Sequence, residues 1–397
     1  MKYLFLKDMR YRQARGVLTA LGITLLISLI LLLGGIMNGM RIQAQQYVNS
    51  TGADIWISAE GSGGAFIGFS LLEEELMAFL GSSPGLVENS ASPLIFAQAR
   101  PTVNGKPTKA MVVGYTLGNL GGPKQVVEGR MFTPRKYMDY RPEDHVPYEV
   151  IVDEKMGLEI GEKITISKDE VRVVGKAKSL MFVLDTPLLF MDIRAAQRVL
   201  LENTPYVNMM VAKADNKYTP DEVAANLDAF GAIEARTLEH TLSDIMEYWV
   251  DQPMKAVQFL RVMLWLVAGL LVGMITYVTM LEKTQEIGVL KAIGASNSYV
   301  MTLLLKQVAL ISVIGVGIGF CLSYIFAAAA PIFVKINLVE SVIVACISLI
   351  VCCGSGYLAA RKGIKVDPMI AFRGEIDSTP IRNIDIPTAN VALIGNK

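Results

Sequence analysis

Four long stretches of the chain contain no charged residue. They lie between Arg15 and Arg41 (25 residues), Arg261 and Glu282 (20 residues), Lys306 and Lys335 (28 residues), and Glu340 and Arg361 (20 residues). A helix that spans the hydrocarbon core of a bilayer needs about 20 consecutive apolar residues. The pattern therefore predicts four transmembrane helices, the first within residues 1–40 and the others at about 262–281, 307–334 and 341–360.

The first apolar stretch follows a basic segment, which is also a feature of secretory signals. The basic residues are Lys2, Lys7, Arg10, Arg12 and Arg15. The apolar segment of a signal is only about 7–15 residues long, and no convincing small-x-small cleavage site follows this one. We therefore expect a membrane helix, with cleavage as the alternative.

Charge supports a membrane protein and predicts its orientation. Only 19% of the residues are charged, against about 25% in soluble domains. Residues 41–256 contain 21 basic and 29 acidic residues, whereas the rest of the chain contains 16 and 8. Because basic short segments stay in the cytoplasm, both termini and residues 282–306 are predicted to lie inside. The basic balance is a topology signal, so nucleic acid is not an expected partner.

The region between the first two membrane helices alternates strand and helix patterns. Strand patterns cover residues 53–58, 92–99, 109–116 and 207–214. Ser70–Glu73 and Thr219–Glu222 match capping boxes, and Gly81 and Gly231 follow as helix stops. We predict a membrane α-helical fold class with four transmembrane helices and a large α+β extracytoplasmic domain, residues 41–256, inserted between helices 1 and 2.

Two parts of this external domain have a distinct pattern. Residues of about 130–200 carry short β patterns and predict a β-rich insert. The glycine-rich stretch 61–69 predicts a mobile loop. Its Phe66, Ile67 and Phe69 either contact lipid, substrate or a partner, or belong to an ordinary connection.

Several chemistries are excluded by what the sequence lacks. It has no G-x-x-x-x-G-K-[ST] motif, so it has no phosphate-binding loop of the usual kind. His145 and His240 are the only histidines and have no metal-ligand spacing, so no metal site is expected. The membrane helices have uncharged cores, which argues against an ion-coupled carrier. No catalytic residue is predicted, and any energy for work should come from a partner.

Small residues recur at helix spacing within the membrane segments. Gly269 and Gly273 lie four residues apart on the second membrane helix. Such a face allows close approach of another helix. It predicts either a dimer contact or packing within the chain.

A compact charged segment, EKTQEIGVLKAIG (282–294), directly follows the second membrane helix. Ile287, Leu290 and Ile293 form a narrow apolar stripe at helical spacing. Gly294 is placed to end the helix, and Ser296 or Asn297 to cap the next one. We predict a short amphipathic helix that docks a soluble partner, with a solvated interfacial helix as the alternative.

This segment resembles the signature of the FtsX/MacB-type permeases of ABC transporters. The matching positions are Glu282, Lys283, Glu286, Ile287, Gly288, Leu290, Lys291 and Gly294. The segment 360–375 resembles the family's terminal motif through Asp367, Pro368, Ala371 and Arg373, with Phe372 in place of leucine. Residues 127–134 and the one-plus-three order of membrane helices also resemble the family. Within it, the chain looks closest to the DevC/HrtB-like branch, which lacks a fused ATPase.

The resemblance implies a coupling helix at 282–294 that inserts in a groove of a cytoplasmic ATPase. It implies a homodimer working with two copies of that ATPase, which bind ATP and Mg²⁺, so this chain needs no cofactor. Movement would pass to the external domain by mechanotransmission and export a lipid, haem or other hydrophobic substrate. The expected location is a bacterial inner membrane, with a periplasmic adaptor and an outer-membrane channel as further candidate partners.

Three alternatives and two departures accompany this interpretation. The alternatives are an FtsX-like regulator of a cell-wall hydrolase, a lipoprotein-releasing permease of the LolC/LolE type, and a receptor with no ATPase. Pro253 predicts little room for the long stalk helices of MacB. The tail after Glu375 matches no motif.

Overall fold

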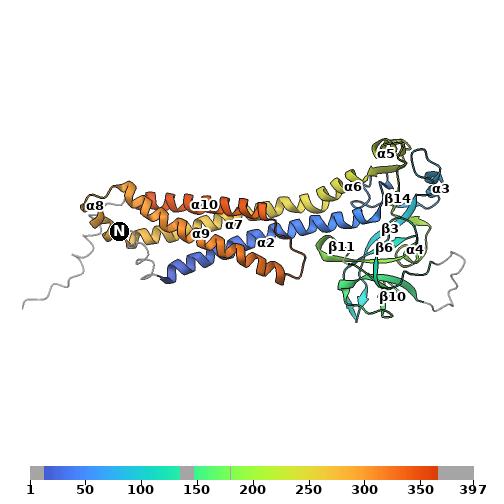
Figure 1. Cartoon of the computed structure of the whole chain (residues 1–397), viewed down its shortest axis with the longest axis horizontal. Coiled ribbons are helices and arrows are strands. Elements are labelled where there is room, and N and C mark those ends of the chain that lie inside the picture. Colours follow the sequence, from blue (N-terminus) through green and yellow to red (C-terminus); the bar gives the residue numbers. More distant parts are fainter. Residues whose placement is uncertain (1–12, 135–146, 179, 365–397) are drawn as a thin grey trace, which may run out of the picture. The chain divides into compact units, whose positions relative to one another are not determined.

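The computed structural model describes residues 13–134, 147–178 and 180–364 (Figure 1). The described chain divides into two compact units. One unit holds the described residues of 13–28, 262–322 and 342–364. The other holds Leu29–Arg261 and Ser323–Ser341. We call them the helical unit and the sheet unit.

Among the described residues, four helices are long and apolar enough to cross a membrane. They are α2 (Gln13–Thr51), α7 (Gln252–Glu282), α9 (Asn297–Ala329) and α10 (Leu338–Ile364). In hydrocarbon there is no water to bond the backbone, so a helix, which pairs these groups internally, is the form such segments take. The prediction of four membrane helices is confirmed.

Glycines let α9 approach α2 closely within the helical unit. A Cβ atom at Gly315 would lie 2.9 Å from Ile23 Cβ, and one at Gly319 would lie 2.9 Å from the Thr24 carbonyl oxygen. Thr24 Oγ1 donates a hydrogen bond of 3.1 Å to the Gly315 carbonyl. The small residues thus serve packing within the chain.

The described part of the sheet unit is built on one sheet of 13 strands. Its main path runs β15-β1-β14-β3-β6-β12-β8-β10-β9-β4-β5, with β11 beside β12 and β7 beside β10. The strands are β1 (Ile55–Ala59), β3 (Ser92–Ala99), β4 (Thr102–Val103), β5 (Lys106–Pro107), β6 (Ala110–Tyr115), β7 (Val126–Gly129), β8 (Tyr148–Asp153), β9 (Lys163–Ile166), β10 (Asp169–Ala177), β11 (Met181–Phe182), β12 (Thr186–Asp192), β14 (Met209–Ala212) and β15 (Ile233–Thr237). A separate pair consists of β2 (Leu72–Glu73) and β13 (Tyr206–Val207).

Both faces of this sheet are buried. Ile55 and Ile57 lie in one hydrophobic cluster, and Trp56 between them lies in a second. The second cluster also contains Tyr47 and Val48, near the end of α2. Alternating side chains of a strand point to opposite faces, so α2 supplies cover for one face.

Helices and turns complete the sheet unit. They are α3 (Leu76–Gly81), α4 (Ile193–Leu201), α5 (Pro220–Asp228), α6 (Leu238–Ile245), the 3₁₀ turns η2 (Glu154–Met156) and η3 (Val183–Asp185), and the π-helical η4 (Met246–Asp251). The capping box at Thr219 is present, with reciprocal bonds to Glu222. The α+β character predicted for this region is confirmed.

The predicted helix start at Ser70 is wrong. Leu72 and Glu73 form strand β2, and α3 begins only at Leu76. The Ser70 hydroxyl instead accepts a hydrogen bond from the Ala59 backbone N–H. Tertiary pairing therefore overrides the local capping signal.

The β patterns of the middle region form strands of the main sheet. β12 pairs in parallel with β6 and antiparallel with β8, so the strands of this region continue the same sheet. The short helix α4 follows β12 and packs near Gly114 of β6, where a Cβ atom would lie 2.3 Å from Ala196 Cβ.

Pro253 does not shorten the helical run before the second membrane span, contrary to the expectation from sequence. α6, η4 and α7 together make a helical run of 45 residues, Leu238–Glu282. Pro253 is the second residue of α7, but α7 continues η4 without a break, so the residue without an N–H lies inside the run. The π-helical segment η4 lies directly before it, and the wider turn of η4 accommodates a proline within the helical run.

A buried ion pair joins three helices within the sheet unit. Arg261 Nη2 lies 2.6 Å from Glu340 Oε1, and Asn38 Nδ2 donates to Glu340 Oε2 at 2.7 Å. The Arg261 side chain is only 4% exposed. A Cβ atom at Gly34 would lie 1.7 Å from Arg261 Nη2, so the glycine makes room for the guanidinium. This cluster connects α2, α7 and α10.

Replacing Glu340 by alanine should destabilise the protein, because it leaves the buried Arg261 without its counter-ion. Loss of one partner of a buried charged pair costs roughly 2–5 kcal/mol. Glu340 is 30% exposed, so we expect about 2 kcal/mol, seen as a lower Tm in thermal unfolding of the detergent-solubilised chain. The exposed Lys335 provides a control, since Lys335→Ala should change stability by less than about 0.5 kcal/mol. Equal Tm shifts for the two variants would contradict this role of the ion pair.

Candidate functional site

The predicted coupling segment forms a separate short helix, α8 (Thr284–Ala292). It is set off from α7 at Lys283, whose backbone leaves the helical region. At its other end Gly294 has a φ of +95°, the left-handed conformation that favours glycine. The Ala295 N–H bonds to the Leu290 carbonyl and the Gly294 N–H to the Lys291 carbonyl, which closes a Schellman motif.

The next helix begins directly after this turn. The Ser296 hydroxyl accepts a hydrogen bond of 3.2 Å from the Tyr299 backbone N–H, as an N-cap does. Of the two residues proposed as caps, Ser296 is therefore the one used. Both ends of α8 are thus defined by specific backbone bonds.

One face of α8 packs against the helical unit. Ile287 is 8% exposed and shares a hydrophobic cluster with Met280, Val300, Leu304 and Ala360. Gly288 beside it is buried as well. The contact braces α8 against the ends of α7, α9 and α10.

The predicted apolar stripe is therefore divided between two environments. Ile287 faces the chain's own core, Leu290 is half-buried and Ile293 is 77% exposed. The three residues are therefore not presented together to a partner. The sequence could not show this, because hydrophobic periodicity does not specify which neighbour covers an apolar helix face.

The exposed face of α8 mixes acidic and apolar residues. It is formed by Gln285, Glu286, Val289, Ala292 and Ile293, which recur at helical spacing. Glu282, the last residue of α7, is exposed just before it. Burial lowers the pKa of the Lys283 ammonium, and the nearby Glu286 acts in the opposite direction. The exposed surface is a compact helix face with a negative edge.

The two glycines of the second membrane helix have a neighbour within the chain. A Cβ atom at Gly269 would lie 3.1 Å from Val351 Cγ1, and one at Gly273 would lie 3.8 Å from Ser355 Cβ. Both contacts are with α10. The packing alternative therefore accounts for these positions without a second copy.

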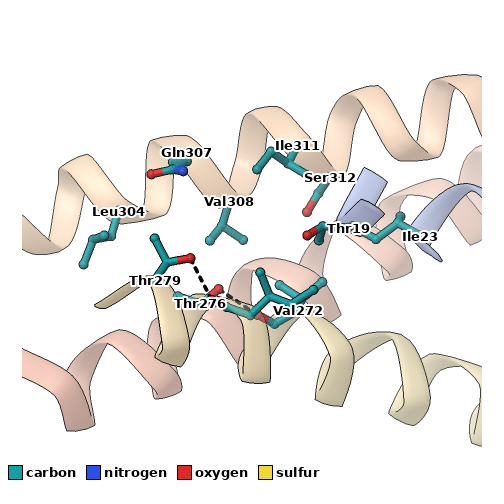
Figure 2. A pocket seen from close by; sticks show the side chains of 11 residues that line it. Thr19, Ile23, Val272, Thr276, Thr279, Leu304, Gln307, Val308, Ile311 and Ser312 are labelled. Atoms are coloured by element: carbon teal, nitrogen blue, oxygen red, sulfur yellow. Dashed lines mark hydrogen bonds between the residues drawn. The ribbon is translucent and has the colours of Figure 1, made fainter. Parts of the chain in front are cut away.

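A small cavity lies between α2, α7 and α9 (Figure 2). Its volume is about 40 Å³, and it is lined by Thr19, Ile23, Val272, Ile275, Thr276, Thr279, Leu304, Gln307, Val308, Ile311 and Ser312. Thr276 and Thr279 donate their hydroxyl protons to the carbonyls of Val272 and Ile275. The cavity has room for one or a few waters, and its lining carries no ionisable side chain.

The glycine-rich loop 61–69 is anchored by its first aromatic residue. Phe66 is buried, with its ring centroid 5.0 Å from those of Trp56 and Phe96. Trp249 Nε1 donates a hydrogen bond of 3.1 Å to the Phe66 carbonyl. Phe66 is therefore a core residue and does not meet lipid or substrate, whereas Phe69 is 87% exposed.

Two further predictions concern the C-terminal motif and metal binding. Asp367, Pro368, Ala371 and Arg373 lie outside the described residues. Among the residues that are described, no group of three or more His, Cys, Asp or Glu side chains could hold a metal ion.

Sequence comparison covers nearly the whole chain. The family described as the MacB-like periplasmic core domain matches residues 17–230, and the FtsX-like permease C-terminal family matches residues 259–368. An uncharacterised ABC transporter permease of Mycobacterium tuberculosis (strain H37Rv) is 24% identical over 381 residues, covering 94% of this chain and 100% of the relative. A putative hemin transport system permease protein, HrtB of Staphylococcus epidermidis, is 26% identical over 57% of this chain and 63% of its own length.

Among solved structures, the periplasmic region of MacB from Actinobacillus actinomycetemcomitans is similar to part of the chain. It covers 50% of this chain and 94% of its own, with 13% identity and a TM-score of 0.35. The family assignment comes from the two sequence matches. The first match ends before the second membrane helix, and the second match includes that helix. The chain therefore belongs to the FtsX/MacB-type permeases of ABC transporters.

Proposed function

We propose that this chain is the permease subunit of an ATP-driven exporter for a lipid, haem or another hydrophobic substrate. The observation that carries the proposal is α8, a short helix with defined ends, one face packed on the helical unit and the other face exposed. Glu286, Val289 and Ile293 on the exposed face offer the mixture of charge and apolar surface that protein interfaces use. The similarity to a putative hemin transport permease supports haem as one candidate substrate.

The partner of α8 in this proposal is a separate cytoplasmic ATPase of the ABC type. Two copies of it would bind ATP and Mg²⁺ and work with a homodimer of this chain. Closure of the ATPases on ATP would move α8. Because Ile287 packs on Val300, Leu304 and Ala360, a displacement of α8 would pass to the first turns of α9 and the last turns of α10.

Mechanotransmission also accounts for the lack of charged residues in the cores of the membrane helices, because it requires no ion or substrate to pass between them. The cavity between α2, α7 and α9 has a volume of about 40 Å³, far below the roughly 300–1,000 Å³ of typical ligand sites, so these three helices enclose no room for a substrate. Substrate would instead be handled at the external domain or outer leaflet. We place this chain in a bacterial inner membrane with both termini inside, and an adaptor with an outer-membrane channel could extend the route.

The purified chain should hydrolyse no ATP by itself, because its sequence contains no phosphate-binding loop. Hydrolysis should appear when an ABC-type ATPase that co-purifies with the chain is added back. The measurement is phosphate release by the chain alone, by the ATPase alone and by the complex, with composition checked by mass spectrometry. Hydrolysis by the chain in the absence of any contaminating ATPase would refute the assignment of roles.

Substitutions on the two faces of α8 should have different effects. Glu286→Lys reverses a charge on the exposed face, so we expect normal membrane abundance and an unchanged Tm, with reduced recovery of the ATPase and loss of stimulated hydrolysis. Ile287→Ala is the matched change on the packed face. It should lower the free energy of unfolding by about 2–5 kcal/mol, as for other buried Ile→Ala changes.

Co-purification yield and thermal unfolding distinguish these two outcomes. If Glu286→Lys recovers as much ATPase as the wild type and retains its stimulation, the exposed face of α8 does not dock the ATPase. A Tm loss in Glu286→Lys equal to that of Ile287→Ala would show a folding defect instead, and would equally contradict the proposal.

The predicted orientation can be tested by labelling cysteines on a background that lacks Cys321, Cys346, Cys352 and Cys353. Asn216 and Ser296 are both exposed, so a cysteine at either site can react. Asn216→Cys should react with an impermeant maleimide on intact spheroplasts, whereas Ser296→Cys should react only after lysis. Ser62 is unsuitable, because it is buried and bonds to Ser58. Reaction of Ser296→Cys from outside would reverse the assigned topology.

A further inference from the structure

A long groove runs along the surface of the helical unit between α7 and α10. Its volume is about 760 Å³, within the roughly 300–1,000 Å³ of ligand sites. It is lined by Leu266, Gly269, Leu270, Gly273, Met274, Tyr277, Val351, Ser355, Leu358, Ala359 and Lys362. Except near one end, the lining is apolar or small.

Small residues make the groove and larger ones border it. Gly269 and Gly273 lie against α10 near Val351 and Ser355. Because these glycines have no side chain, the surface of α7 is recessed at these positions. The Ser355 hydroxyl donates to the Cys352 carbonyl within its own helix, so it requires no partner in the groove. The lining thus offers an apolar slot open to the surroundings of the helices.

The length of the slot matches one leaflet of a bilayer. Val351 and Lys362 are 11 positions apart on α10, which corresponds to about 16 Å at 1.5 Å per residue. Half of the hydrocarbon core measures about 15 Å. With Lys362 at the headgroup level, a slot of this length would reach about the middle of the membrane.

The polar end of the slot carries a positive charge. Lys362 is exposed there, and Tyr277 on α7 lines the same groove. Lysine and tyrosine are typical of the membrane–water interface, where the former attracts anionic headgroups. An apolar slot of one-leaflet length that ends at an ammonium group fits an acyl chain with an anionic headgroup.

A second copy of the chain fits the same groove less well. Two-fold symmetry would bring the same surface of both copies together. Each Lys362 ammonium group would then be buried in a largely apolar interface whose lining offers no acidic side chain, and an unpaired buried charge is costly. The charge at the groove's end favours a negatively charged occupant.

We propose that the groove between α7 and α10 binds an anionic phospholipid, with one acyl chain in the slot and the phosphate against Lys362. The acyl chain lies along the groove surface that Gly269 and Gly273 form together with Val351 and Ser355 of α10. It thereby stabilises the contact between the two helices whose ends brace α8. This site is separate from the ATPase-docking face.

The chain contains a natural reporter for this site. Of its tryptophans, Trp56 and Trp249 lie in the sheet unit, whereas Trp265 lies on α7 directly before Leu266 of the groove. Trp265 Nε1 donates a hydrogen bond of 3.1 Å to Ser348 Oγ of α10. Bromine atoms near the end of a bound acyl chain would quench its fluorescence.

The experiment compares two brominated lipids at the same low mole fraction in phosphatidylcholine vesicles that contain the full chain. One is phosphatidylglycerol and the other phosphatidylcholine, each brominated near the methyl end, and Trp265→Phe gives the blank. We expect phosphatidylglycerol to be enriched roughly fivefold near Trp265, the factor contributed by about one basic residue at the surface. Lys362→Gln should remove the preference, whereas Lys306→Gln, an exposed lysine on α9 outside the groove, should retain it.

Equal quenching by the two lipids in the wild type would overturn the proposal, as would a preference that survives Lys362→Gln. A second copy as the occupant is tested with Met274→Cys on the cysteine-free background. Disulfide-linked dimers forming efficiently in the membrane would show that another chain covers the groove, and would overturn the lipid assignment. Lipid-selective quenching without such dimers supports it.

Discussion

The absence of water in the hydrocarbon core is the constraint on which the rest of this structure depends. Every backbone polar group at that depth must be paired within the protein, and the uncharged stretches can meet this demand only as helices. Polar side chains in them turn to backbone carbonyls, as Thr24 does toward Gly315 and Thr276 toward Val272. Charged residues are left to the borders of the uncharged stretches, where α8 and a buried ion pair are found.

One of these features is α8, whose two faces lie in different environments. Ile287 attaches the helix to the ends of α7, α9 and α10, and its opposite face stays exposed. A helix that only floated at the membrane surface could bind a partner but could not pass on a displacement. Packing on one face and exposure on the other, within nine residues, are what the coupling role proposed for α8 requires.

The other feature is the ion pair of Arg261 and Glu340, which lie in the N-terminal parts of α7 and α10. Each residue borders an uncharged stretch in the sequence, 79 positions from the other. Buried charges are costly unless paired and hydrogen-bonded, and Asn38 together with the space at Gly34 meets this requirement. The pair ties α2, α7 and α10 together just where the uncharged stretches end.

The sequence alone determined the four membrane helices, the α+β domain between the first two, and the family, because long apolar runs and a compact motif are local signals. The glycine stop of α8 also follows from local chemistry, whereas its start after Lys283, and not at Glu282, was seen only in the structure. Only the tertiary structure decided that Ile287 faces inward, that Ser70 pairs with Ala59 instead of capping a helix, and that Phe66 is a core residue. It also decided that Gly269 packs on α10 and that Arg261 meets Glu340. Each of these depends on a neighbour distant in the chain, and hydrophobic period or residue type cannot specify which surface that neighbour will cover.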